Sequence, residues 1–271
     1  MRPTLTEPLM AAGSGVHATA LLDESVELGA DVSIGPYCVI GPNVSLGDGV
    51  TLGAHVVIER DTRLGTGCRV HSGAVVGGDP QDLKYAGEST RLEIGDRTVI
   101  RECATLNRGT GDGGVTRVGS DCLLMAYSHV AHDCQLGDRV VISNAVEMAG
   151  HVLIEDWAVI GGLTAIHQFV RIGRHAIVGG ATALRKDVPP FVKAAGNPAS
   201  LFGLNSVGLQ RRGFDEDTRR ALRNAYRLLF QSELNVRQAV AAAREQVKMT
   251  AEVEHLLDFI EKSERGVAVQ R

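Results

Sequence analysis

The chain of 271 residues carries a formal net charge of −4 and is 44% hydrophobic, which fits one large globular domain with a smaller one. This charge gives no general electrostatic reason to expect binding to nucleic acid or to an anionic membrane, and no apolar run approaches the roughly eighteen residues of a membrane span. Residues 1–16, a short N-terminal extension, lack the apolar stretch of a secretory signal. We therefore expect a cytoplasmic protein.

Aliphatic residues recur at every sixth position from Leu22 to Leu184. Of the 28 positions in this register, 25 are Leu, Ile, Val or Met. A period of six differs from the helical 3.6 and from the strand alternation of two, and it is typical of a triangular coil in which each face uses one hexapeptide. The pattern predicts a mainly β protein, a left-handed parallel β-helix of about nine 18-residue coils over residues 17–190.

Two other positions of the repeat are also restricted. A small or β-branched residue lies two positions before the aliphatic one, and four of the five cysteines fall there and are expected to fill the core. Because the cysteines are odd in number and include no C-x-x-C pair, they indicate neither a disulfide framework nor a zinc site. A glycine often follows the aliphatic residue, where we expect it to form a tight corner. The four core cysteines are Cys38, Cys68, Cys122 and Cys134.

The three exceptions to the register are Asp82, Glu88 and Asp112. Because the phase is kept on both sides of each interruption, we expect loops at residues 78–91 and 109–114. Loops on a rigid scaffold are where function concentrates.

After Leu184 the repeat stops, and three prolines at 189, 190 and 198 predict a linker into a C-terminal helical domain, residues 191–271. Asp215 is a candidate N-cap for a helix that reaches Phe230. Residues 236–246 have a helical composition. A last helix has Thr250 as its cap and apolar residues at i, i+3, i+4 and i+7 from position 253.

In such a coil the sequence spacing predicts which residues stack, because residues 18 apart lie on adjacent coils about 4.8 Å apart. His132 is then expected beneath Gly150, which lies beneath Gln168. Asp133 is expected beneath His151 by the same spacing.

The hexapeptide that ends at Asp133 contains a candidate general base. With Val130 directed inward, His132 is expected to project outward from the coil, and a histidine suits the deprotonation of a sugar hydroxyl near neutral pH. Asp133 would fix its tautomer and raise its basicity. The backbone N–H of Gly150 would serve as an oxyanion donor.

Two alternatives explain these histidines without acyl transfer: solvated corner positions, and a zinc site of the kind that hexapeptide carbonic anhydrases share between subunits. Four of the nine histidines lie within 39 residues, which disfavours the first alternative. They are His129, His132, His151 and His167.

Five motifs, in this order, resemble the UDP-N-acetylglucosamine O-acyltransferase family that begins lipid A biosynthesis. The resemblance extends from about residue 17 to the end of the chain. The motifs are G-x-x-Q-D-L-K-Y-A-G-E (78–88), N-R-G-T (107–110), H-V-A-H-D-C (129–134), G-G-L-T-A-I-H-Q-F (161–169) and G-L-Q-R-R-G-F (208–214).

The resemblance implies transfer of a 3-hydroxyacyl group from the phosphopantetheine of acyl carrier protein to the glucosamine 3-position of a UDP-amino sugar, with no metal or other cofactor. It implies a homotrimer with the site between subunits. His132 would be the general base, Asp133 its orienting partner and Gly150 the oxyanion donor. Gly180 falls at the acyl-length position and implies a long chain.

The remaining implied site residues bind the substrates. Asp82, Lys84 and His129 would hold the sugar and its phosphates, while His151, His167 and Gln168 would line the same cleft. Asn205, Arg211 and Arg212 would reach the nucleotide. Further arginines from 219 to 227 offer an acidic carrier protein a basic surface, or form a solvated helix face.

Two positions depart from the family pattern. Asn107 stands where the best-known members have histidine, which implies a changed preference at the sugar, including a 3-amino analogue that would give an amide product. Val207 replaces an acidic residue near the nucleotide and implies weaker uridine binding.

Three other functions stay open at this point. The related N-acyltransferase normally has an additional N-terminal uridine-binding domain, whereas only about twenty residues precede the repeats here. A hexapeptide acetyltransferase that uses acetyl-CoA would not need the loop of residues 81–84. A β-helical scaffold that only binds partners would tolerate replacement of His132.

Overall fold

The structure is a computed structural model that describes residues 15–269. Of the expected N-terminal extension, residues 1–14 lie outside the described residues, and Gly15 and Val16 form the first strand. The described chain divides into two compact units, one ending at Arg139 and the other beginning at Val140.

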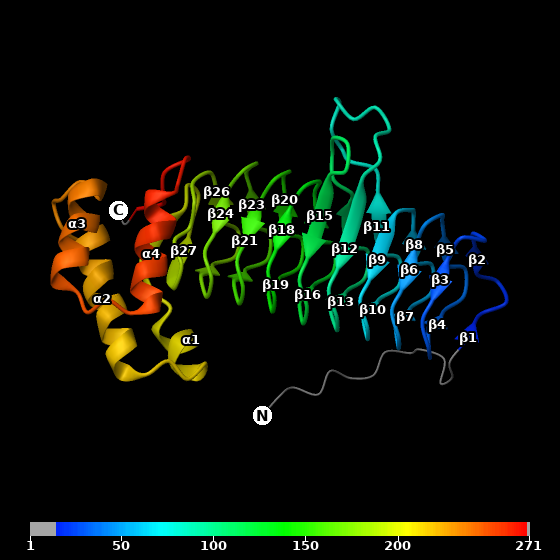
Figure 1. Cartoon of the computed structure of the whole chain (residues 1–271), viewed down its shortest axis with the longest axis horizontal. Coiled ribbons are helices and arrows are strands. Elements are labelled where there is room, and N and C mark those ends of the chain that lie inside the picture. The colour runs from blue at the N-terminus through cyan, green and yellow to red at the C-terminus, as the bar shows by residue number, and fades with distance from the viewer. Residues whose placement is uncertain (1–14, 270–271) are drawn as a thin grey trace. The chain divides into compact units, whose positions relative to one another are not determined.

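The first unit consists of short strands stacked in three parallel sheets, each coil contributing one strand to each sheet (Figure 1). One sheet has β1 (Gly15–Val16), β4 (Ser33–Ile34), β7 (Thr51–Leu52), β10 (Arg69–Val70), β13 (Val99–Ile100) and β16 (Leu123–Leu124). The next has β2 (Leu21–Leu22), β5 (Val39–Ile40), β8 (Val57–Ile58), β11 (Val75–Gly78), β14 (Thr105–Asn107) and β17 (His129–Val130). The third has β3 (Glu27–Leu28), β6 (Ser45–Leu46), β9 (Thr62–Leu64), β12 (Arg91–Ile94), β15 (Val115–Val118) and β18 (Gln135–Leu136).

The strand register confirms both predicted loops. Neighbouring strands pair residues 18 apart, as in Val39 with Val57. The separation rises to 30 across the first loop, where Val70 pairs with Ile100, and to 24 across the second, where Ile100 pairs with Leu124. The first loop, residues 79–90, projects from the coils (Figure 1).

The aliphatic residues of the six-residue register form the core, and from Ile34 to Leu184 they are almost fully inaccessible. The four cysteines at the small-residue phase are buried, whereas Cys103, which lies at another phase, is exposed. The sequence interpretation of these cysteines is therefore confirmed.

The expected reason for the repeat glycines is wrong. Gly41 has no left-handed backbone, but a Cβ on it would lie 1.8 Å from the carbonyl oxygen of Glu59 on the next coil. Glycine is required there because two coils approach closely. The left-handed corner lies three residues after the aliphatic position, as at Asp133 (φ 60°) and His151 (φ 59°).

In the second unit the coils continue in the same pattern, with residues 18 apart paired. One sheet has β19 (Val141–Ile142), β22 (Val159–Ile160), β25 (Ile177–Val178), β27 (Val192–Ala195) and β28 (Ser200–Leu204). The other two have β20 (Glu147–Met148), β23 (Ala165–Ile166) and β26 (Ala183–Leu184), and β21 (Leu153–Ile154) and β24 (Arg171–Ile172).

The proline-rich segment expected to be a linker instead contains strands β27 and β28. β27 pairs with β25, and β28 turns back antiparallel to β27. Val192 and Ala194 are buried, so the segment extends the core and covers what would otherwise be an open strand edge.

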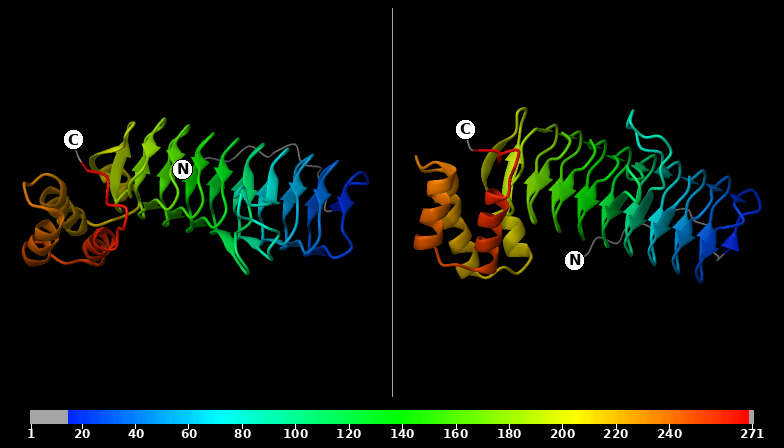
Figure 2. Two further views of the ribbon diagram at one scale, coloured as in Figure 1. Left: turned by 90° about the horizontal axis from the view of Figure 1, so that it is seen from above. Right: turned by 45° about the horizontal axis from the view of Figure 1, so that its top comes forward.

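Four helices follow, and α2 packs against α3 and α4 (Figure 2). α2 (Glu216–Phe230) and α4 (Ala251–Glu261) begin at the predicted caps Asp215 and Thr250, each of which accepts a backbone N–H, and α3 (Val236–Gln246) has the predicted bounds. The short helix α1 (Ser206–Arg211) was not predicted. Among residues 15–269, no helix has the length and apolar character that a membrane crossing requires.

Candidate active site

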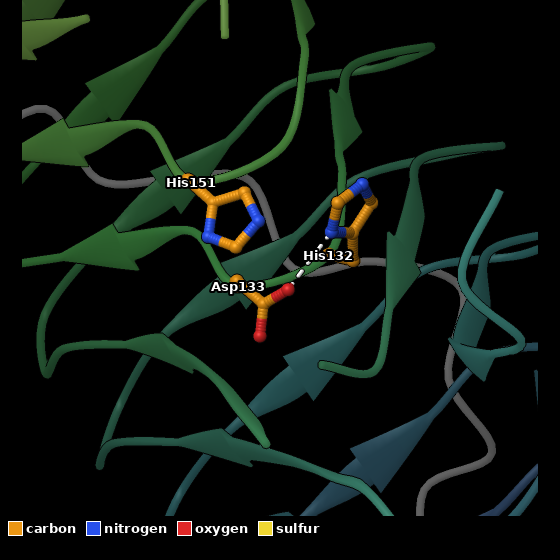
Figure 3. Close-up of side chains that lie close together, drawn as sticks. All are labelled: His132, Asp133 and His151. Atoms are coloured by element: carbon orange, nitrogen blue, oxygen red, sulfur yellow. Dashed lines mark hydrogen bonds and ion pairs between the residues drawn. The ribbon is translucent and has the colours of Figure 1, made fainter. Parts of the chain in front are cut away.

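The His132 imidazole and the Asp133 carboxylate are joined by a hydrogen bond of 2.8 Å between Nδ1 and Oδ2 (Figure 3). The two adjacent side chains converge where the left-handed backbone at Asp133 turns the chain sharply after β17. Because the carboxylate only accepts, this bond favours the tautomer with a proton on Nδ1. Nε2 then carries the lone pair that a general base needs.

Thr110, on the second loop, holds the Asp133 carboxylate. Its Oγ1 donates to Oδ2 at 2.6 Å, and its backbone N–H lies 3.1 Å from Oδ1. His132 lies outside the apolar interior, as its phase predicts, but only 6% of the residue is exposed. Folded chain outside the coil therefore covers this position.

His129, the other histidine of this coil, is half-buried, and its Nδ1 lies 2.7 Å from the hydroxyl of Thr105. Burial lowers the pKa of His129, and the nearby His132 lowers it further. His129 is therefore neutral near pH 7 and offers a hydrogen bond rather than a charge.

Asp82 and Lys84 lie on the projecting first loop, within one turn. The backbone N–H of Lys84 donates to the Asp82 carboxylate at 2.9 Å, and that of Tyr85 donates to the Asp82 carbonyl at 3.0 Å. The Lys84 side chain is exposed, and so is Leu83. Asp82 and Lys84 therefore place an anion and a cation close together on this loop.

In the second unit, His151 occupies a left-handed corner, and its ring stacks on Phe169 with centroids 4.8 Å apart. The Phe169 N–H donates to the Gly150 carbonyl at 3.2 Å, and the register of β20 with β23 stacks Gln168 on Gly150 as expected. Figure 3 also shows His151, which the 18-residue spacing predicted above Asp133.

His167 lies beside a mainly apolar cavity of about 380 Å³. Its Nδ1 is 3.2 Å from Nη2 of Arg265, a residue that sequence reasoning missed because it follows the last helix. The cavity is lined by Glu147, Met148, Ala149, Ala165, Ile166, His167, Ala183, Leu184 and Arg185.

Asn205 and Arg212 are already engaged within this chain. Asn205, 2% exposed, caps α1 by accepting the Gly208 N–H at 3.1 Å, and it donates to the His175 carbonyl at 3.0 Å. The Arg212 guanidinium lies 4.8 Å from the Trp157 ring centroid and 3.1 Å from Nδ1 of His175. The expected nucleotide contacts of these residues stay predictions.

The same surroundings change two pKa values. Burial lowers the pKa of the Arg212 guanidinium, while burial, followed by the charge of Arg212, lowers the pKa of His175 to about 4. Arg211 is exposed. Of the arginines along α2, Arg219 and Arg223 pair with Glu216, and the Arg219 side chain is only 19% exposed.

Gly180, the expected acyl-length position, is exposed in the second unit. A Cβ there would lie 3.2 Å from the Gly162 carbonyl oxygen.

Comparisons with known proteins decide the family. A family model described as "Udp N-acetylglucosamine O-acyltransferase; Domain 2" matches residues 187–268, and one described as "Bacterial transferase hexapeptide (six repeats)" matches residues 25–60 and 116–150. The acyl-[acyl-carrier-protein]–UDP-N-acetylglucosamine O-acyltransferase of Herminiimonas arsenicoxydans is 47% identical over 257 residues, which cover 93% of this chain and 98% of the relative. That of Thiobacillus denitrificans is 48% identical over 253 residues, with the same coverage.

The chain belongs to the UDP-N-acetylglucosamine O-acyltransferase family. A solved structure of LpxA from Acinetobacter baumannii agrees, with a TM-score of 0.91 and 45% identity over 93% of this chain and 99% of that one. Membership confirms the resemblance found in the motifs and the left-handed β-helix with a helical C-terminal region.

Within this family the two departures have distinct surroundings. Asn107 is 7% exposed, and its Nδ2 donates to the Asp79 carbonyl at 2.6 Å, while its Oδ1 has no hydrogen-bond partner among residues 15–269. Val207, on α1, is 61% exposed.

Proposed function

We propose that this chain transfers a long 3-hydroxyacyl group from acyl carrier protein to the 3-hydroxyl of UDP-N-acetylglucosamine, the first step of lipid A biosynthesis. The observation that carries the proposal is the His132–Asp133 pair, bonded at 2.8 Å in a member of this family. Its relatives' names supply the substrates, and the loop of residues 81–84, which a hexapeptide acetyltransferase would not need, favours this reaction over a simple acetyl transfer.

In this reaction Nε2 of His132 takes the proton as the sugar oxygen attacks the thioester carbonyl carbon. Asp133 stabilises the imidazolium that forms, and the Gly150 N–H donates to the oxyanion. The C–S bond then breaks, and the leaving sulfur receives the proton from Nε2. The product is an ester, and the balance requires no cofactor.

The substrate contacts follow the family pattern. Asp82, Lys84 and His129 bind the sugar and its phosphates, while His151, His167 and Gln168 line the cleft. Asn205, Arg211 and Arg212 serve the nucleotide. The enzyme works in the cytoplasm as a homotrimer whose subunits share the site.

Asn107 favours one variation of this function. Its buried Oδ1 is an acceptor without a partner among the described residues, and such a group gains from a donor on the substrate. A 3-amino sugar would supply N–H donors and give an amide product. The assay should therefore offer both acceptors, and Asn107→His is expected to favour the hydroxyl sugar.

Gly180 sets the acyl-length expectation. With no side chain at this position, longer acyl chains are accommodated, so Gly180→Met is expected to shift the preferred donor to a shorter chain.

The test of the function is acyl transfer from 3-hydroxyacyl carrier proteins of several chain lengths to UDP-N-acetylglucosamine and to its 3-amino analogue. Ester formation from a long-chain donor supports the main proposal. Transfer to the amino analogue alone would change the acceptor assignment, and no transfer to either acceptor would overturn the proposed function.

A further inference from the structure

Arg108 is a buried cation directed at the base of the first loop. Only 1% of the residue is exposed. Its guanidinium donates to the carbonyl of Gly77 and to the carboxylate of Asp79, and Nη2 lies 3.3 Å from the hydroxyl of Tyr85. These partners lie at or near the start of the loop that carries Asp82 and Lys84.

The backbone around Arg108 adds to this attachment. The Arg108 N–H donates to the Gly78 carbonyl at 2.9 Å, and Nδ2 of Asn107 donates to the Asp79 carbonyl at 2.6 Å. A buried charge is tolerated when it is paired and hydrogen-bonded, so the bonds of the guanidinium to Gly77 and Asp79 offset part of the cost of its burial, while the backbone bonds add to the attachment. The loop is therefore fastened at its base although its tip is exposed.

Two residues farther along, the same segment reaches the other part of the site. Thr110 donates its hydroxyl to Oδ2 of Asp133 at 2.6 Å, and its backbone N–H lies 3.1 Å from Oδ1. Oδ2 also accepts a hydrogen bond of 2.8 Å from Nδ1 of His132. Thr110 thus fixes the plane of the carboxylate that orients the histidine.

We propose that residues 107–110 form a positioning element that serves both parts of the site. Arg108 holds the first loop where Asp82 and Lys84 meet the sugar nucleotide, and Thr110 holds Asp133 in the orientation that aligns His132. The inference rests on the proposed function, because it assigns these two residues to substrate binding and to proton transfer respectively. Neither is a catalytic residue, since each acts through others.

The two halves of the element predict different kinetic effects. Loss of the Arg108 contacts frees the loop, which weakens binding of the sugar nucleotide and raises its KM. Loss of the Thr110 hydroxyl leaves the loop attached but removes its hydrogen bond to the Asp133 carboxylate, which loosens the orientation of that group and lowers kcat.

For Arg108, the variants are Arg108→Met and Arg108→Lys, with Arg117→Met as the matched control. Arg117 lies on β15, and its side chain is half exposed and pairs with Glu93. We expect Arg108→Met to raise the KM for UDP-N-acetylglucosamine about tenfold or more, as hydrogen bonds to a charged group imply, with a partial recovery in Arg108→Lys. A KM equal to that of the Arg117 control would overturn this half.

A second set of variants covers the case in which Arg108→Met does not fold. Asp79→Ala and Tyr85→Phe remove the side-chain contacts with Arg108 from the loop side, where the Asp79 side chain is 66% exposed and easily replaced. Trypsin cleavage after Lys84 reports loop attachment directly and needs no activity. We expect faster cleavage in these variants than in the Arg117 control, and equal cleavage would contradict the attachment.

The proteolysis result separates this inference from the proposed function. If the wild type transfers no acyl group but the loop variants are cleaved faster than the control, the proposed function is wrong and the loop attachment stands. Normal transfer with unchanged cleavage and unchanged KM would sink the positioning role of Arg108 alone.

For Thr110, the variants are Thr110→Val and Thr110→Ser, with Thr51→Val as the control. The Thr51 hydroxyl is buried without a hydrogen-bond partner among the described residues, so its removal breaks no such bond. We expect Thr110→Val to lower kcat about tenfold or more at unchanged KM, and Thr110→Ser to recover most of it. A kcat equal to that of the Thr51 control would overturn this half.

Discussion

Within the first unit, the uninterrupted coils and the interrupted ones differ in what they bury. Up to Val76, neighbouring strands keep an 18-residue separation, and apart from Thr62 the buried residues are aliphatic or cysteine. Where the separation changes to 30 and 24, the chain buries Arg108 and His132. The repeat therefore supplies a rigid frame, and its interruptions supply the polar groups that chemistry requires.

The largest expected effect is a difference in kcat between variants of two aspartates that occupy similar left-handed corners. Asp133 (φ 60°) orients His132, whereas Asp121 (φ 58°) pairs with the exposed Arg97. We expect Asp133→Asn to lower kcat by about 10²–10⁴-fold, because an amide does not enforce the required tautomer. Steady-state kinetics should show Asp121→Asn close to wild type, and equal losses in both variants would mean that the corner acts structurally.

A smaller effect concerns two glycines in the uninterrupted coils. Gly41 faces the Glu59 carbonyl, so Gly41→Ala is expected to cost about 3 kcal/mol of unfolding free energy through overpacking. Gly49 has a left-handed φ of +66° with open space around it, and Gly49→Ala should cost about 1 kcal/mol. Urea denaturation measures both, and the reverse order would contradict the coil-contact explanation.

The next effect concerns pH and a corner histidine in the second unit. Burial and the charge of Arg212 lower the pKa of His175 to about 4. Between pH 6.5 and pH 4 this histidine is therefore protonated in the unfolded chain but neutral in the folded one. This histidine contributes no penalty above pH 6.5, and stability falls as the pH drops from there toward 4. We expect a loss of about 2 kcal/mol between pH 7 and pH 5.

His175→Phe keeps the stacking with Trp157 and Phe191 and should remove this part of the pH dependence. Unfolding by urea at both pH values makes the measurement. An identical slope in wild type and variant would show that other groups cause the loss.

The smallest expected effect concerns the reactivity of the cysteine thiols. Cys103 is exposed, whereas burial raises the pKa of Cys68 to about 11. A thiol reagent should therefore label the native chain at one residue, and Cys103→Ser should abolish labelling while changing stability by less than about 0.5 kcal/mol. Rapid labelling of the Cys103→Ser variant would contradict the packed core.

The sequence predicted the frame because each coil repeats one local rule, and the helix caps Asp215 and Thr250 are local signals too. The sequence also predicted that Asp133 is the partner of His132. It could not predict that Thr110 holds Asp133 or that Arg108 fastens the first loop, because these contacts span 23 to 31 residues and depend on loop conformation. Periodicity carries no information about irregular segments.

The central claim is that His132, oriented by Asp133, is the general base for acyl transfer to the sugar. The most direct measurement is transfer from long-chain 3-hydroxyacyl carrier protein to UDP-N-acetylglucosamine by wild type and by His132→Ala, with folding checked by circular dichroism. We expect rapid transfer by wild type and a loss of about 10²–10⁴-fold in His132→Ala, which should fold normally. Wild-type turnover in His132→Ala would contradict the central claim.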